Sequence, residues 1–153
     1  MVIPRFITRP IKPRGEKMST PVRPYESVVI VRENASVEAQ KELFRKNKAI
    51  IEEFDGNLNT LETWGKKQLA NMIGKEKQGV YFHATFTANA NTVAELERTM
   101  KINDNVLRYM HIRLEDETDL NKHMDAFKES IVEAQKREKE REAKIAKRKV
   151  TRK

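Results

Sequence analysis

The order of hydrophobic periods along this chain predicts an α+β domain with two helices on one face of a four-stranded antiparallel sheet. Stretches in which apolar residues alternate, as in strands, are interrupted by two stretches in which apolar residues recur at helical spacing. The resulting order is strand, helix, strand, strand, helix, strand. Right-handed crossovers then place both helices on the same face of one sheet.

The first half of the predicted domain holds a strand, a helix and a long strand. The run SVVIVR at 27–32 is rich in β-branched residues, as in a strand that is buried on both faces. Ser36 is a suitable N-cap for a helix over 37–54, and Gly56 is expected to end this helix in a left-handed conformation. Residues 57–69 are expected to form the long, partly polar strand that follows.

The third strand has the clearest alternation in the chain. A basic connection that contains glycines is expected to follow residue 69 and to lead into this strand at Val80. From there every second residue is apolar. Phe82 and Phe86 are therefore expected to face the helices, while Tyr81 and His83 face the other side.

The second helix and the last strand complete the domain. Thr92 and Glu95 have the spacing of a capping box at a helix N-terminus, and residues 106–114 alternate again as a strand. With both crossovers of the same hand, the predicted fold is the ferredoxin-like βαββαβ sandwich. We place this domain at residues 23–115.

The N-terminal end differs from the domain in composition. All five prolines lie within the first 24 residues, which predicts a flexible, basic and Pro-rich extension over residues 1–22. If translation starts at Met18, residues 1–17 are an upstream extension. The prolines also argue against an organelle transit peptide, because they break the amphipathic helix that such a peptide needs.

A charged helical extension with an apolar beginning is expected over residues 116–153. Its first part carries one apolar stripe at 4, 3, 4 spacing, formed by Leu120, Met124, Phe127 and Ile131. A stripe of this kind is suited to docking on another surface. Beyond Glu133 the stripe fades into a run of charged residues.

The end of this extension is a basic tail. Residues 134–153 hold ten Lys or Arg residues against three Glu residues and have almost no apolar surface. Glu133 with Arg137 and Glu140 with Lys144 are spaced for ion pairs that favour a helix. We nevertheless expect the tail to be disordered or a frayed helix on its own, and to gain order against RNA or a neighbouring protein.

Charge and composition limit the function classes. The formal net charge is +8, but residues 1–24 carry +5 and residues 134–153 carry +7, which leaves about −4 for residues 25–133. Two basic ends on a mildly acidic body suggest arms that reach toward a polyanion. The absence of cysteine excludes disulfides and thiolate metal sites, and no apolar run approaches the length of a membrane span.

Catalytic chemistry finds no support in the sequence. The three histidines, His83, His111 and His123, have neither metal-ligand nor catalytic spacing. The chain also lacks a Gly-rich phosphate loop and a nucleophile motif. We therefore expect no enzyme activity, no metal, no cofactor and no small-molecule substrate.

Three short motifs occur in one consistent order between residues 23 and 115. They are RPYE at 23–26, a block from 65 to 75, and NVLR at 105–108. Within the block the matching residues are Gly65, Lys67, Leu69, Ala70, Ile73 and Lys75. In this pattern the chain resembles the bacterial ribosomal protein S6 family of the small subunit.

The resemblance implies the ferredoxin-like fold and a structural, non-catalytic role in the cytoplasmic ribosome. It implies binding to the central domain of small-subunit rRNA together with ribosomal protein S18, with the open sheet and the edge of the long strand as partner surfaces. RNA contacts are expected from residues in or near the motifs, where solvated cations can meet phosphate. The candidate RNA-binding residues are Arg23, Tyr25, Lys66, Lys67, Lys75, Lys77 and Arg108.

Two other function classes share this fold. One is a free RNA-binding regulator or ribosome-assembly factor, and the other is a small-ligand-sensing module, for which the sequence shows no pocket signature. Base stacking in the manner of an RRM is poorly supported, because Phe82 alone fills one of the three positions that need aromatic residues. Trp64 is expected to pack within the domain rather than to stack on a base.

Overall fold

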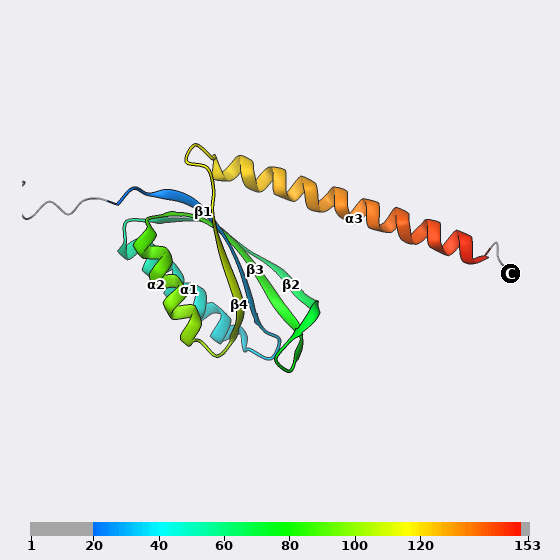
Figure 1. Ribbon diagram of the computed structural model, residues 1–153, viewed down its shortest axis with the longest axis horizontal. Coiled ribbons are helices and arrows are strands. Elements are labelled where there is room, and N and C mark those ends of the chain that lie inside the picture. The colour runs from blue at the N-terminus through cyan, green and yellow to red at the C-terminus, as the bar shows by residue number, and fades with distance from the viewer. Residues whose placement is uncertain (1–19, 151–153) are drawn as a thin grey trace, which may run out of the picture.

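The computed structural model describes residues 20–150, with side chains described up to residue 148 (Figure 1). The elements of this range are β1 Arg23–Arg32, α1 Val37–Glu53, β2 Asn57–Ile73, β3 Glu76–Ala88, α2 Ala90–Ile102, β4 Val106–Arg113 and α3 Leu120–Val150. The expectations for residues 1–17 and for Met18 lie outside the described residues. No helix between residues 20 and 150 is both long and apolar enough to cross a membrane.

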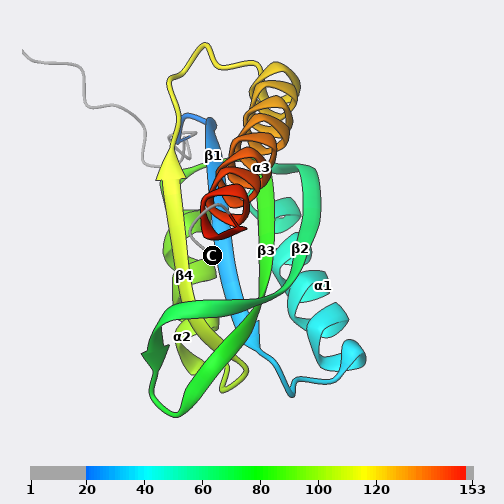
Figure 2. The ribbon, with the colours of Figure 1, turned by 90° about the vertical axis from the view of Figure 1, so that its right-hand side faces the viewer.

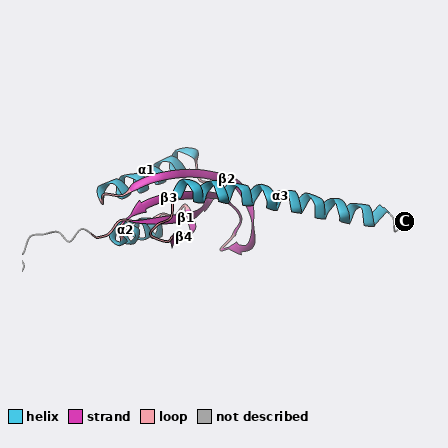
Figure 3. Cartoon of the chain, turned by 90° about the horizontal axis from the view of Figure 1, so that it is seen from above, coloured by secondary structure: helices cyan, strands magenta, loops and turns pink. Residues whose placement is uncertain are grey.

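The four strands form one antiparallel sheet in the order β2-β3-β1-β4, so β1 and β3 are central and β2 and β4 are the edges. Helices α1 and α2 cover one face, and α3 lies on the side of the opposite face (Figure 1 and Figure 2). Seen from above, the distal half of α3 extends away from the domain (Figure 3). The strand order confirms the predicted ferredoxin-like fold.

The core lies between the sheet and the helices α1 and α2. Pairing of β1 with β3 sets Tyr25 opposite Phe86 and Val29 opposite Phe82, which puts these four side chains on the helix-covered face. Phe86 is 1% exposed, and Phe82 packs on Phe44 of α1 with ring centroids 4.4 Å apart. The expected direction of the two phenylalanines of β3 is therefore confirmed.

Helix α1 begins as predicted but ends differently. Ser36 is the N-cap, and its hydroxyl accepts a hydrogen bond from the backbone N–H of Ala39 at 3.1 Å. The left-handed residue after the helix is Asp55, with a φ of 61°, and not Gly56. Gly56 is required at this position for a steric reason instead, because a Cβ there would clash with the carbonyl oxygen of Thr87 at 2.5 Å.

Helix α2 starts earlier than the predicted capping box. Asn89 is its N-cap, and the side-chain oxygen of Asn89 accepts hydrogen bonds from the backbone N–H and the hydroxyl of Thr92, at 2.9 and 3.1 Å. Glu95 does not reach back to the helix start and pairs with Arg98 on the surface. The expected cap was wrong because a stronger capping residue stands three positions ahead of Thr92.

Strands β2 and β3 form a longer hairpin than the sequence predicted. β2 continues to Ile73 and β3 begins at Glu76, where a connection up to Val80 was expected. The turn contains Gly74, whose φ of 61° is a conformation that glycine adopts without strain. Part of the basic segment is therefore paired strand, which fixes the positions of Lys66 and Lys67.

Helix α3 is continuous from Leu120 to Val150, which corrects the expectation of a disordered or frayed tail. The first turns are packed on the domain and provide the nucleus that an isolated helix lacks. The distal part is rich in Ala, Glu, Lys and Arg, which propagate a helix well. Of the two expected ion pairs, Glu133 with Arg137 is formed, whereas Glu140 with Lys144 is not.

Replacing Phe86 by Ala should lower the free energy of unfolding by about 3–5 kcal/mol, because this ring is enclosed between sheet and helices. Phe82→Ala should cost less, since Phe82 is only partly buried. Urea unfolding of the two variants measures both losses. Equal losses would show that the two rings are equally enclosed in solution, against the structure.

Candidate nucleic-acid interface

Four predicted RNA-binding residues lie together on the distal part of the β2–β3 hairpin. Lys66 and Lys67 are on β2 opposite Val80 and Gly79, Lys75 is in the turn, and Lys77 is near the start of β3. All four lysines are exposed. Among the described residues, only Lys66 of these four has an acidic partner, Glu33. We call this set of four lysines the hairpin cations.

The hairpin is fastened to the central strand of the sheet. The guanidinium of Arg32 on β1 pairs with Glu76 at 2.9 Å and donates to the backbone carbonyl of Asp104 at 2.7 Å. Gly79 packs so closely on β1 that a Cβ would lie 2.6 Å from Cγ2 of Ile30. The hairpin cations are therefore carried by a braced strand pair rather than by a loose loop.

The remaining three candidates are not part of one cluster. Arg108 is exposed on β4 opposite Ile30, at the hairpin end of the sheet. Arg23 is at the other end of β1, about 30 Å by strand rise from Arg32 and the hairpin cations. It lies 3.6 Å from Asp116. Tyr25 is 8% exposed and stacks on Phe86 in the core, so its ring is not accessible to a base.

An open groove of about 580 Å³ lies between α1 and the edge strand β2. Its apolar lining comes from Val37, Phe44, Leu58, Leu61 and Phe82. Cations border it on the α1 side: Lys41, Arg45 and Lys48. Val37 and Leu61 are 57% and 40% exposed, so this groove leaves apolar surface uncovered beside a strand that has no neighbour on one side.

The opposite face of the sheet is partly covered by α3. The rings of Trp64, His83 and Phe127 stack on one another, with centroid distances of 5.0–5.5 Å. Leu120 and Met124 of the same helix are buried. Trp64 is thus a packing residue, as expected, and the apolar stripe of the C-terminal extension docks on its own domain.

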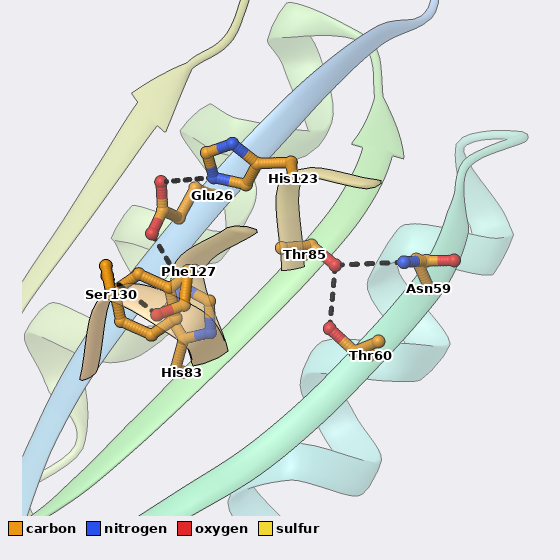
Figure 4. A network of polar contacts seen from close by, with 8 residues as sticks. All are labelled: Glu26, Asn59, Thr60, His83, Thr85, His123, Phe127 and Ser130. Atoms are coloured by element: carbon orange, nitrogen blue, oxygen red, sulfur yellow. Dashed lines mark hydrogen bonds and ion pairs between the residues drawn. The ribbon is translucent and has the colours of Figure 1, made fainter. Parts of the chain in front are cut away.

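A polar contact accompanies this packing (Figure 4). The carboxylate of Glu26 on β1 accepts hydrogen bonds from Nε2 of His83 at 2.7 Å and from Nε2 of His123 at 3.1 Å. His123 belongs to α3, so one carboxylate links the helix to two sheet strands. An ion pair of 2.7 Å between Lys128 and Glu62 adds a second link.

The charge state of Glu26 follows from these partners. Burial by itself raises the pKa of Glu26, but the hydrogen bonds and charges of His83 and His123 outweigh it and lower the pKa below the ordinary value of 4.5. The carboxylate is therefore ionised at neutral pH. Within residues 20–150, no group of three or more His, Asp or Glu side chains is arranged to hold a metal ion.

The family of the chain follows from a match over the whole βαββαβ domain. A family model described as Ribosomal protein S6 matches residues 24–113, from β1 to the end of β4. The chain belongs to the ribosomal protein S6 family. This confirms the resemblance, and the three motifs of this S6 chain lie on or beside β1, β2 and β4.

Individual relatives agree with the family. The S6 chain is 56% identical over 121 residues to the small ribosomal subunit protein bS6 of Bdellovibrio bacteriovorus, covering 79% of this chain and 80% of the relative. Identity to bS6 of Geobacter metallireducens is 41% over 97 residues, which covers 63% of this chain and 82% of the relative. The crystal structure of 30S ribosomal protein S6 from Thermotoga maritima matches with a TM-score of 0.57 and 25% identity, covering 72% of this chain and 99% of that one.

The contact among Glu26, His83 and His123 has no direct sign in the S6 sequence. His83 and His123 lie 57 and 97 positions from Glu26, and each residue is unremarkable in its own segment. A partial signal existed, because His83 was expected on the open face and His123 adjoins the apolar stripe of α3. Only the strand register and the direction of α3 bring the three side chains together.

Acid should release α3 from this S6 domain. Because the pKa of Glu26 is lowered in the folded protein, its contribution to docking is present above pH 4.5 and is lost as the pH falls through the lowered value. Trp64, the single tryptophan, contacts Phe127, so its fluorescence reports docking. The emission should change below pH 4.5, and Glu26→Gln should show the undocked signal at neutral pH.

Glu133→Gln is a matched control for this experiment, because Glu133 pairs with Arg137 on the exposed part of α3 and lies away from the docked turns. It should titrate like the unmodified protein. If the Trp64 emission of Glu26→Gln equals that of the unmodified chain at neutral pH, Glu26 does not hold the helix.

Proposed function

We propose that this chain binds small-subunit rRNA through the hairpin cations and acts together with ribosomal protein S18 on the central domain of that RNA. The observation that carries the proposal is the gathering of four solvent-accessible lysines on a braced hairpin of an otherwise mildly acidic domain. Arg108 extends this basic end of the sheet. Family membership supplies the setting, the small ribosomal subunit in the cytoplasm.

The role is structural, and we assign the chain no catalysis, cofactor or small-molecule substrate. Lysines that meet phosphates release the counterions condensed on RNA, and this release favours binding without any covalent step. Strand pairing fixes the positions of Lys66 and Lys67, and the turn and the start of β3 carry Lys75 and Lys77 beside them. We therefore propose that the hairpin cations recognise the shape of a folded backbone rather than a base sequence. Such contacts stabilise a folded RNA junction.

The groove between α1 and β2 is the surface we assign to the protein partner. It combines exposed apolar side chains, a border of cations and a strand edge, and these features suit a segment of another protein. The open face of the sheet, the other surface expected for a partner, is partly occupied by α3. S18 seated in the groove would leave the hairpin cations free for RNA.

The competing proposal is a free RNA-binding regulator on the same fold. Sequence-specific readers of this topology stack bases on the centre of the open sheet. Here His83 is fully buried at that place under Phe127 of α3. The covered sheet centre favours the structural role over the regulator.

Neutralising two hairpin cations should weaken the salt dependence of rRNA binding. With the full chain, S18 and a central-domain rRNA fragment, Lys75→Gln with Lys77→Gln should reduce the slope of log affinity against log salt by about 0.7–0.9 for each phosphate that is no longer neutralised. Lys101→Gln with Lys122→Gln removes the same charge from exposed positions on α2 and α3 and should change the slope less. Tight sequence-specific binding by the chain without S18 would instead support the regulator.

An acidic residue in the groove should abolish the cooperation with S18. Val37→Glu places a carboxylate at the first position of α1, where the helix dipole favours it, so the fold should be retained. RNA binding by the variant should no longer improve when S18 is added. Val132→Glu, at a 66% exposed position on α3, is the control, and an unchanged response of Val37→Glu to S18 would place the partner elsewhere.

A further inference from the structure

The distal part of α3, residues 132–150, projects from the domain as a single helix, which we call the arm (Figure 1 and Figure 3). All side chains from 132 to 148 are exposed. The base of α3 is fixed by the packing of Leu120, Met124 and Phe127 on the sheet. At 1.5 Å per residue the arm is about 28 Å long, so it reaches well beyond the surface of the domain.

One face of the arm carries a line of cations. Arg137, Arg141, Lys144 and Arg148 follow one another at 4, 3, 4 spacing, which places them along one side of the helix over about 16 Å. We call these four residues the arm stripe. They border one shared surface patch that also includes Glu140 and Ile145. Lys136 and Lys139 fall outside this patch.

Most of the charge on the arm stripe is uncompensated. Arg137 pairs with Glu133, whereas Arg141, Lys144 and Arg148 have no acidic partner within the described chain. Glu140 does not neutralise Lys144 although it stands four residues before it. A straight row of exposed cations is therefore presented to the surroundings of the domain.

The form of this row identifies the class of ligand. A convex line of cations without a cavity fits an extended polyanion with regularly repeated charges, and three of the four residues are arginines, which suit phosphate groups. A membrane surface fits poorly, because the large apolar side chains exposed on the described part of the arm are only Val132 and Ile145, too few for an apolar face.

We propose that the arm stripe binds the backbone phosphates of an RNA helix and forms a second RNA-binding surface, separate from the hairpin cations. The docked half of α3 sets the direction of the arm. The arm stripe contacts the phosphates of the RNA backbone and does not recognise the base sequence. This inference goes beyond the proposed function, because it requires neither S18 nor a particular rRNA site.

The test compares two double variants that remove equal charge from the two sides of the arm. Arg141→Gln with Arg148→Gln removes half of the arm stripe, and Lys136→Gln with Lys139→Gln removes two cations outside it. The probe is a fluorescent RNA hairpin unrelated to rRNA, titrated with the full chain over a range of salt concentrations without S18. Circular dichroism checks that α3 stays helical in both variants.

The stripe variant should lower the log–log salt slope by about 1.4–1.8, which corresponds to two phosphate contacts, and the off-stripe variant should change it by less than half as much. Arg141→Lys with Arg148→Lys should keep the slope. Equal losses from both sides, or no loss from the stripe, would overturn the proposal. Stripe-dependent binding to vesicles of phosphatidylserine and phosphatidylcholine, without a change in RNA binding, would also overturn it in favour of a membrane surface.

These outcomes are separate from those for the proposed function. A failure of S18 cooperation or of the hairpin variants does not change the arm result, since the two arm variants share the same hairpin cations and are compared with each other in the absence of S18. Conversely, if the arm does not bind RNA, the proposals for the hairpin cations and for the groove are unaffected.

Discussion

The stacking of Phe127 on Trp64 and His83 is the contact on which the rest of this architecture depends. It covers the centre of the open sheet, so the ring of His83 at that place is not accessible to a base. It sets where α3 begins to leave the domain and therefore where its charged half is carried. It also leaves the groove beside α1 and the β2–β3 hairpin as uncovered features on other parts of the domain.

The two basic surfaces hold their cations by different means. On the hairpin, strand pairing and the contacts of Arg32 fix the backbone beneath the lysines. On the arm, the helix itself spaces the charges, and neighbouring elements contribute nothing. In both cases the backbone is ordered before RNA arrives, so binding has to immobilise only the side chains. A mildly acidic body between the two surfaces limits binding to other parts of the domain.

Local patterns predicted most of the fold, and contacts distant in sequence account for most of what they missed. The alternation in β3 indicated the correct face for Phe86, and Ser36 marked the correct start of α1. The predicted start of β3 was wrong because polar, lysine-rich residues can form a hairpin when the partner strand supplies the pairing. Of the candidate site, the sequence identified the hairpin cations, but the burial of Tyr25 and the link from Glu26 to α3 depend on strand register.

The bond between Glu26 and His123 joins residues 97 positions apart, and this separation has a consequence for folding order. Closing so long a loop is entropically costly until intervening contacts have already brought its ends together. The site that receives α3 contains residues from β1, β2 and β3, so it is complete only when those strands are paired. During synthesis the helix also leaves the ribosome after all four strands. The arm therefore acquires its direction as the last step of folding, and a chain with an unfinished sheet cannot present it correctly.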